Sequence, residues 1–226
     1  MSKIQELKKK LESIPAKQSR KNLVSKLDQY AKITEAASTM IQMCASAKQY
    51  AQQVFGDEEF QKVSDHTRKA VNTAKRLRDK LTDKVEAVEK SDAQFRDISD
   101  AAKSAQAALR DRWNFLLNKK VEEFERIVRA AKDANLGGSR ALEQTLHRLS
   151  GQINNPPQSG DVAQRIEQDL KGLVNSVQTL GLEGPAGQFL VEAAAGRGRA
   201  KDLSNPEIIK FIERYNLWNS LNVRLG

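Results

Sequence analysis

The stretch from Glu58 to Leu136 contains neither glycine nor proline. These two residues interrupt helices, because glycine costs backbone entropy and proline lacks an amide hydrogen. Apolar side chains recur through the stretch at intervals of three and four, which aligns them along one side of an α-helix. The same spacing runs from about Arg20 to Phe55. We therefore expect an all-α protein built on long amphipathic helices.

A Gly-Asp pair at residues 56 and 57 separates these two regions. Glycine favours the left-handed conformation that ends a helix, and aspartate is a common cap for the next one. Ser91 opens a Ser-x-x-Gln pattern typical of a capping box, which predicts a break there; one helix over residues 58–136 is the alternative. With the break, helix 58–91 matches helix 20–55 in length. The match predicts an antiparallel coiled-coil hairpin, in which facing residues have numbers that sum to about 113.

Glycine and proline divide the rest of the chain into shorter pieces. Residues 1–13 form a basic amphipathic arm that ends before Pro15. The clearest loop is Asn-Asn-Pro-Pro-Gln-Ser-Gly at residues 154–160. It divides the sequence into a long-helix coiled-coil region, residues 1–153, and a compact C-terminal helical unit, residues 161–226.

Cap residues and glycines predict the helices on both sides of this loop. They are expected from Ser139 to Gly151, from Asp161 to Gly181, from Gln188 to Ala195 and from Pro206 to Leu221. Proline suits the first position of the last helix, where its missing N–H costs nothing. This last helix is the densest apolar segment of the chain, so we expect it to be buried against another element.

Positive charge is concentrated in the long helices. The chain has 38 basic and 29 acidic residues, and 28 basic residues accompany 20 acidic ones before residue 137. The excess gathers in residues 1–32 and 62–84, where it would attract polyanions over a Debye length of roughly 8–10 Å. The plainer interpretation is a solvated helix surface that keeps the protein in solution.

A glycine-rich basic segment at residues 196–201 is suited to wrap a phosphate, or is an exposed loop without a ligand. Together with the basic blocks it gives a hypothetical nucleic-acid footprint. Its members are Lys8, Lys9, Lys10, Lys17, Arg20, Lys21, Arg68, Lys69, Lys75, Arg76, Arg78, Lys80, Arg197, Arg199 and Lys201.

The sequence offers little for catalysis or metal binding. Its two histidines, His66 and His147, lie on expected helix surfaces outside any nucleophile-elbow or zincin pattern. No P-loop occurs, and the glycines at 181, 184 and 187 follow a helix, whereas a dinucleotide-binding motif requires a preceding strand. Cys44 lies on the apolar seam and is expected to pack as a small hydrophobe. We predict no catalytic residue, no metal ligand and no cofactor, and hence not an enzyme.

A single cysteine cannot form an internal disulfide, and the sequence has no secretory signal pattern. Both features are typical of a cytoplasmic protein. No stretch approaches the roughly 18 consecutive apolar residues of a membrane span. We therefore expect no membrane partner.

Residues 36–47 are apolar or small around the whole circumference of their helix. A two-helix hairpin buries only one stripe, so these residues predict a second neighbour. It would be another helix of the chain, from its C-terminal half, or another subunit. We assign five residues to a protein interface. Three are the two methionines and the isoleucine of this segment, and two are aromatic residues of the expected last helix, a residue type that dominates buried interface anchors. They are Met40, Ile41, Met43, Tyr215 and Trp218.

Long apolar seams, a surplus apolar face and the missing catalytic groups favour a non-catalytic interaction or scaffold subunit of a larger cytoplasmic assembly. Self-association into an oligomer would satisfy the same features. By analogy of architecture alone, such a chain would suit the small accessory subunit of a coiled-coil ATPase complex acting on DNA, including one of antiviral defence. The alternative is a nucleic-acid-binding protein without sequence preference, which contacts phosphates through its basic helix faces.

Overall fold

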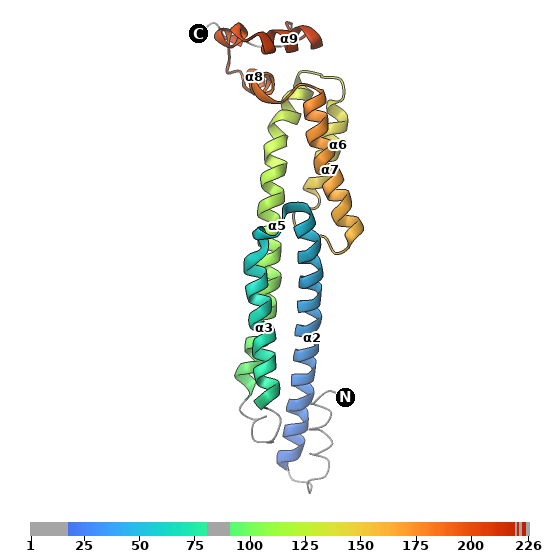
Figure 1. Ribbon diagram of the computed structural model, residues 1–226, viewed down its shortest axis with the longest axis vertical. Coiled ribbons are helices and arrows are strands. Elements are labelled where there is room, and N and C mark those ends of the chain that lie inside the picture. The colour runs from blue at the N-terminus through green and yellow to red at the C-terminus, as the bar shows by residue number, and fades with distance from the viewer. Residues whose placement is uncertain (1–17, 81–90, 220, 222, 225–226) are drawn as a thin grey trace. The chain divides into compact units, whose positions relative to one another are not determined.

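The computed structural model describes residues 18–80, 91–219, 221 and 223–224 (Figure 1). These residues form an all-α fold, which confirms the predicted class. The helices are α2 (Gln18–Phe55), α3 (Gln61–Lys80), α5 (Asp92–Asp133), α6 (Ser139–Ser150), α7 (Gly160–Thr179), α8 (Gly184–Ala194) and α9 (Pro206–Tyr215). Two short 3-10 helices, η1 (Glu58–Phe60) and η2 (Ala200–Ser204), and two strands, β1 (Gly198–Arg199) and β2 (Val223–Arg224), accompany them. The predicted arm at residues 1–13 lies outside the described residues.

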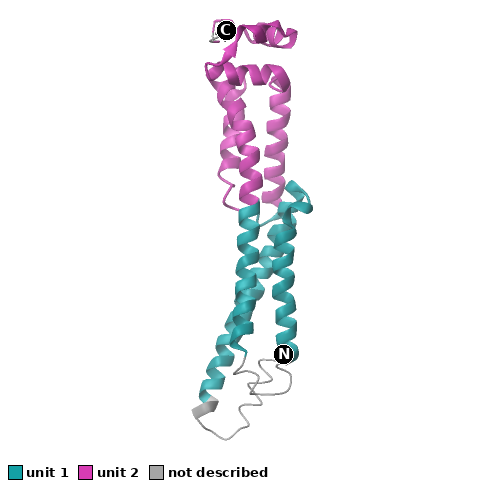
Figure 2. Cartoon of the chain, turned by 90° about the vertical axis from the view of Figure 1, so that its left-hand side faces the viewer, with its two compact units in different colours: residues 1–112, 157–159 teal, residues 113–156, 160–226 magenta. Residues whose placement is uncertain are grey.

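The chain divides into two compact units (Figure 2). Unit 1 contains residues 1–112 and 157–159, and unit 2 contains residues 113–156 and 160–226. This division differs from the predicted one, 1–153 and 161–226. Helix α6 packs on α7, so it belongs with the C-terminal helices although it precedes the Pro-Pro loop. Helix α5 contributes to both units, and a helix without glycine or proline gives no sequence signal where one core ends.

Within unit 1, α2 and α3 form the expected antiparallel hairpin. Gly56 has a φ of 89°, a left-handed conformation that ends α2. Asp57 makes no side-chain capping hydrogen bond, contrary to expectation, because its own backbone is already helical. The Lys48 ammonium donates a hydrogen bond of 2.6 Å to the Ser64 hydroxyl, which agrees with the predicted register.

The first part of α5 packs with α2 and α3 in the described part of unit 1. Ser91 is buried and outside the helix, and its carbonyl accepts a hydrogen bond of 3.1 Å from the Phe95 amide. The helical region from 58 to 136 is therefore broken at the predicted place. The core cluster joins all three helices and contains Leu27, Tyr30, Ala37, Leu77, Phe95, Ile98 and Ala102.

The first part of α5 is the second neighbour that residues 36–47 required. Met40 and Ile41 pack against the core cluster, which includes Ala37 of α2 and Ala102 of α5. Cys44 is 2% exposed, and burial raises the pKa of its thiol, as expected of a packing residue. This neighbour is not the helix from the C-terminal half that we expected, and Met43 of the same segment stays 55% exposed.

Unit 2 is built on the second part of α5 with α6, α7, α8 and α9. Trp113 is fully buried in it, and its indole N–H donates a hydrogen bond of 2.9 Å to the Gln152 carbonyl. Gly138, with a φ of 91°, is the residue before α6, so Ser139 is helical and does not cap that helix as predicted. Asp161 likewise lies inside the first turn of α7, which begins one residue earlier.

The corner between α7 and α8 depends on glycine. Gly181 has a φ of 68°, and the Leu182 amide donates a hydrogen bond of 2.9 Å to the Val177 carbonyl, a common way to end a helix. A Cβ atom on Gly187 would lie only 1.8 Å from the Leu182 carbonyl oxygen. The three-residue glycine spacing is thus explained by left-handed backbone at Gly181 and Gly184 and by close packing at Gly187.

The C-terminal part of unit 2 contains the largest departures from expectation. Helix α9 starts as predicted, because the Asn205 side chain accepts a hydrogen bond of 2.9 Å from the Glu207 amide. It ends at Tyr215, because Asn216 is left-handed with a φ of 51°. The segment expected to be a flexible basic loop contains β1, which pairs in parallel with β2.

Candidate interaction surfaces

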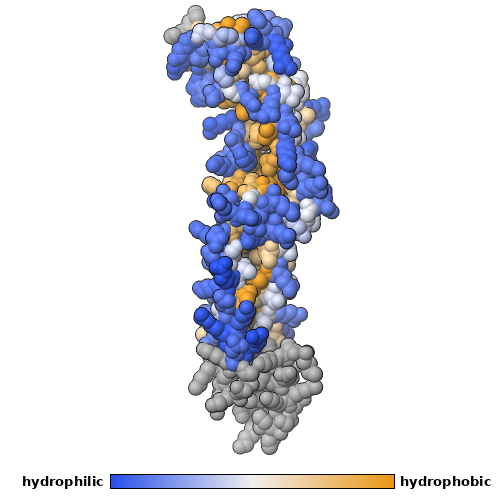
Figure 3. Space-filling view, viewed as in Figure 1, coloured by the Kyte–Doolittle hydropathy of each residue, from blue (hydrophilic) through white to orange (hydrophobic). Residues whose placement is uncertain are grey.

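Helix α3 carries two rows of cations on its exposed side. Lys62, Lys69 and Arg76 form one row, and Arg68 and Lys75 form the other; all five side chains are exposed. Their spacing of seven residues places successive cations of a row about 10.5 Å apart along the helix axis. Figure 3 shows strongly hydrophilic residues over α3. We refer to these five residues as the basic face of α3.

Polar and acidic residues separate the two rows. This middle line consists of Asp65, Asn72 and Asp79, all exposed. Asp65 lies 3.8 Å from the Arg68 guanidinium, and Asp79 lies 3.3 Å from that of Arg78. The two carboxylates therefore neutralise only part of the positive charge on α3.

Of the predicted footprint, the basic face of α3 brings together Arg68, Lys69, Lys75 and Arg76, whereas Arg78 lies on α3 outside this face. Lys8, Lys9, Lys10 and Lys17 lie outside the described residues, as do the side chains of Arg20 and Lys80. Lys21 is exposed on α2, and Arg199 and Lys201 are exposed in unit 2.

Arg197 is engaged by an acidic partner. Its guanidinium donates two hydrogen bonds, of 2.7 and 3.1 Å, to the Glu192 carboxylate on α8. These bonds lower the pKa of Glu192 and raise that of Arg197. A phosphate would have to displace this pair, so residues 196–201 are a poorer phosphate site than their composition suggested.

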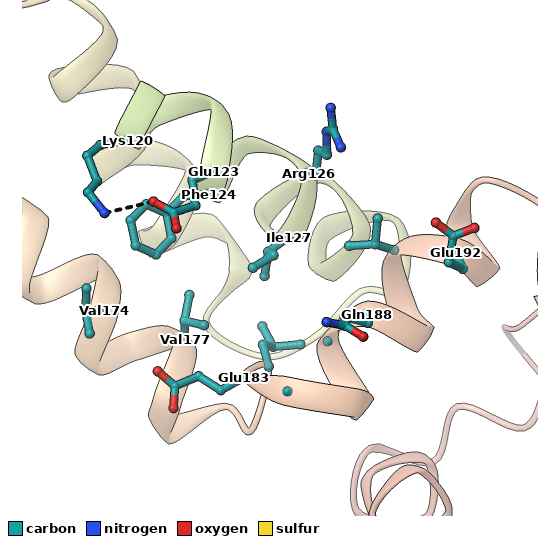
Figure 4. A pocket seen from close by; sticks show the side chains of 14 residues that line it. Lys120, Glu123, Phe124, Arg126, Ile127, Val174, Val177, Glu183, Gln188 and Glu192 are labelled. Atoms are coloured by element: carbon teal, nitrogen blue, oxygen red, sulfur yellow. Dashed lines mark hydrogen bonds and ion pairs between the residues drawn. The ribbon is translucent and has the colours of Figure 1, made fainter. Parts of the chain in front are cut away.

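A groove in unit 2 runs between α5, α7 and α8 and encloses about 680 Å³ (Figure 4). Its apolar lining includes Phe124 and Ile127 of α5, Val174 and Val177 of α7, and Val191 of α8. Charged and polar groups stand along its edges: Lys120, Glu123, Arg126, Glu183, Gln188 and Glu192. We call this feature the unit 2 groove.

Sequence reasoning missed the unit 2 groove, although α5 carries a signal for it. Leu116 and Leu117, and again Ile127 and Val128, are adjacent apolar pairs, so the apolar face of α5 is wider here than one stripe. Leu117 and Val128 are buried, while Leu116 and Ile127 are half-buried. One edge of this wider face packs in the core of unit 2, and the other edge lines the unit 2 groove.

The residues predicted for a protein interface do not form one surface. Met43 is 55% exposed and Met40 is half-buried, and both line a shallow depression between α2 and α5 in unit 1. Ile41 is half-buried against the core of unit 1. In unit 2 the Tyr215 hydroxyl donates a hydrogen bond of 3.0 Å to the Leu180 carbonyl, whereas Trp218 is 51% exposed.

Among residues 18–80 and 91–219, no group of three or more His, Cys, Asp or Glu side chains is arranged to hold a metal ion. His66 is half-buried on α3 and His147 is exposed on α6. No helix within the described residues combines the length and apolar content needed to cross a membrane.

No family model, curated protein or solved structure matches this chain.

Proposed function

We propose that this chain is a non-catalytic interaction subunit that binds a protein partner through the unit 2 groove. The observation that carries the proposal is the unit 2 groove, a hollow of about 680 Å³ with apolar walls from α5, α7 and α8 and charged groups at its edges. A concave site with a mainly apolar lining and a few polar groups at its edge is the usual form of a binding site.

The groove favours an amphipathic helix of the partner as its occupant. Its walls are helices, and helix-in-groove recognition places a few large apolar side chains of one helix face between such walls. Val174, which is 38% exposed, and the half-buried Ile127 and Val191 would receive those side chains.

Charges at the edges of the groove would set the direction of the bound helix. Arg126 stands on the α5 edge, where Lys120 is already paired with Glu123 at 2.9 Å, and Glu183 stands at the corner of α7 and α8. A partner helix with acidic residues toward α5 and a basic residue toward Glu183 would complement them, which adds specificity more than affinity.

As in the sequence analysis, we place this subunit in a larger cytoplasmic complex. One example is a coiled-coil ATPase complex acting on DNA, in which the chain would be the small accessory subunit. A homo-oligomer is the second arrangement, in which the partner is another copy of the chain. The exposed Trp218 of unit 2 supports either arrangement, because tryptophan is enriched at interface hot spots.

The test compares Val174→Glu with Val71→Glu. The two valines are 38% and 37% exposed, but Val174 lines the unit 2 groove while Val71 lies on α3 in unit 1. Each tagged variant is purified with nuclease from the cells in which the chain occurs, and its mass is measured by native mass spectrometry. We expect the wild type and Val71→Glu to carry the same partner and Val174→Glu to lose it.

The mass also distinguishes the two arrangements, because a homo-oligomer is a multiple of 25.3 kDa. Melting curves of the isolated variants serve as the control for folding. A wild-type chain that purifies alone, or a Val174→Glu variant that keeps its partner, would contradict the proposal.

A further inference from the structure

Most cations on the basic face of α3 have no acidic partner among the described residues. Lys62, Lys69, Lys75 and Arg76 make no ion pair within the part of the chain that the structure describes. Arg68 has one weak partner, Asp65, at 3.8 Å. Exposed like charges repel one another, so a face of this kind gains most from a polyanion that contacts several of them at once.

A helical protein partner fits this face poorly. Helices that pair side by side place apolar residues between two flanking rows of charge. On α3 the line between the rows is Asp65, Asn72 and Asp79. Covering it with a helix would remove two carboxylates from water without an apolar seam to offset the cost.

A membrane surface fits poorly as well. A helix that lies on a bilayer inserts bulky apolar side chains between the lipids. The apolar residues Val63, Ala70 and Leu77 of α3 are buried in the core of unit 1. Val71 is the single large apolar side chain that is exposed within residues 61–80, which is too little for insertion.

A nucleic-acid duplex matches the arrangement. Two phosphate strands border each of its grooves, and two rows of cations border the middle of the exposed side of α3. No Phe, Tyr or Trp occurs in α3, so the face lacks the aromatic rings on which single-stranded bases stack. We propose that the basic face of α3 binds the phosphate backbone of double-stranded nucleic acid, without sequence preference. This site is separate from the unit 2 groove.

The test measures fluorescence anisotropy of a labelled DNA duplex with the full chain over a range of salt concentrations. Five phosphate contacts predict that log K falls against log salt with a slope of about −4.5. The triple variant Lys69→Glu, Lys75→Glu, Arg76→Glu should flatten the slope to about −2 and weaken binding at least a hundredfold at about 0.1 M salt.

A second triple variant controls for net charge. Lys119, Arg140 and Lys210 are exposed cations of unit 2, and their replacement by Glu changes the charge of the chain by the same amount. This variant, and Val174→Glu, should bind the duplex within a few-fold of the wild type. If the unit 2 groove binds no partner, the duplex proposal is therefore unaffected. If the basic face of α3 binds no duplex, the proposal for the groove is likewise unaffected.

Folding is checked by melting each variant, and a parallel triple variant with Gln in place of Glu tests neutralisation without reversed charge. Duplex RNA, single-stranded DNA and vesicles that contain phosphatidylserine are titrated beside duplex DNA. Binding to either duplex that is lost in both α3 variants supports the proposal, and the two duplex probes identify which backbone is preferred. The proposal is overturned if the α3 and unit 2 Glu variants lose affinity equally, or if single-stranded DNA binds more tightly than the duplex. It is also overturned if only vesicles bind, or if nothing binds at about 50 mM salt.

Discussion

The Tyr30 hydroxyl on α2 donates a hydrogen bond to the carboxylate of Asp92, the first residue of α5. The Lys26 ammonium donates to the same carboxylate at 3.2 Å. The Tyr30 ring also stacks on Phe95, with centroids 3.9 Å apart. One side chain thus anchors the start of α5 to α2 by a polar and an apolar contact.

Replacing Tyr30 by Phe tests the polar contact while it keeps the stacked ring. We expect the free energy of unfolding to fall by about 1 kcal/mol, the usual net worth of a hydrogen bond inside a protein. Urea unfolding measures the change. Tyr50→Phe is the matched control, because Tyr50 is half-buried on the same helix and should leave stability unchanged. Equal effects of the two substitutions would show that the Asp92 contact contributes nothing.

The same contact predicts a pH dependence. Hydrogen bonds from Tyr30 and then Lys26 lower the pKa of the Asp92 carboxyl in the folded protein. The unfolded chain has the ordinary value of about 3.9. Because the folded pKa is the lower one, the stabilisation is complete above the unfolded pKa and is lost as the pH falls through the folded pKa. The stability difference between the wild type and Asp92→Asn should therefore shrink below about pH 4, and a constant difference would refute this account.

Gly187→Ala should severely destabilise unit 2. A Cβ atom at this position would lie 1.8 Å from the Leu182 carbonyl oxygen, which is backbone and cannot turn aside. We expect a loss of at least about 3 kcal/mol, at the upper end of the range for overpacked sites. Gly172→Ala, in the exposed middle of α7 with nothing within 4 Å, should instead stabilise by up to about 1 kcal/mol. Thermal unfolding distinguishes the two, and a tolerated Gly187→Ala would disprove the close approach.

The two tryptophans should respond in opposite ways. Trp113 is fully buried, so Trp113→Ala should cost about 3–5 kcal/mol. Trp218 is 51% exposed, so Trp218→Ala should leave the isolated chain within about 0.5 kcal/mol of the wild type. Acrylamide quenching checks the exposure directly: Trp218→Phe should leave only weakly quenched emission. A lower melting temperature for Trp218→Ala would mean that this residue belongs to the core.

Most of the helical architecture was predictable because its signals are local. Gly56 ends α2, Ser91 precedes α5 and Asn205 caps α9, and each acts through its own backbone or a neighbouring amide. The spacing of apolar residues gave the correct hairpin. These features depend on residues a few positions apart, which a sequence displays directly.

Some errors are local, such as the caps expected at Asp57, Ser139 and Asp161, and others depend on distant packing. Asn216 ends α9 well before Leu221, because it takes a left-handed conformation that a pattern of apolar residues does not reveal. The pairing of β1 with β2 joins segments that are far apart in the chain. Blocks of basic residues were visible in the sequence, but the unit 2 groove arises from three helices together.

Helix α5 belongs to both units, and this has a consequence for how the protein opens. Residues 92–112 of this helix belong to unit 1, and residues 113–133 belong to unit 2. Local opening of one unit frees the amides of its own part of the helix. Hydrogen exchange along α5 therefore reports two local stabilities within a single helix.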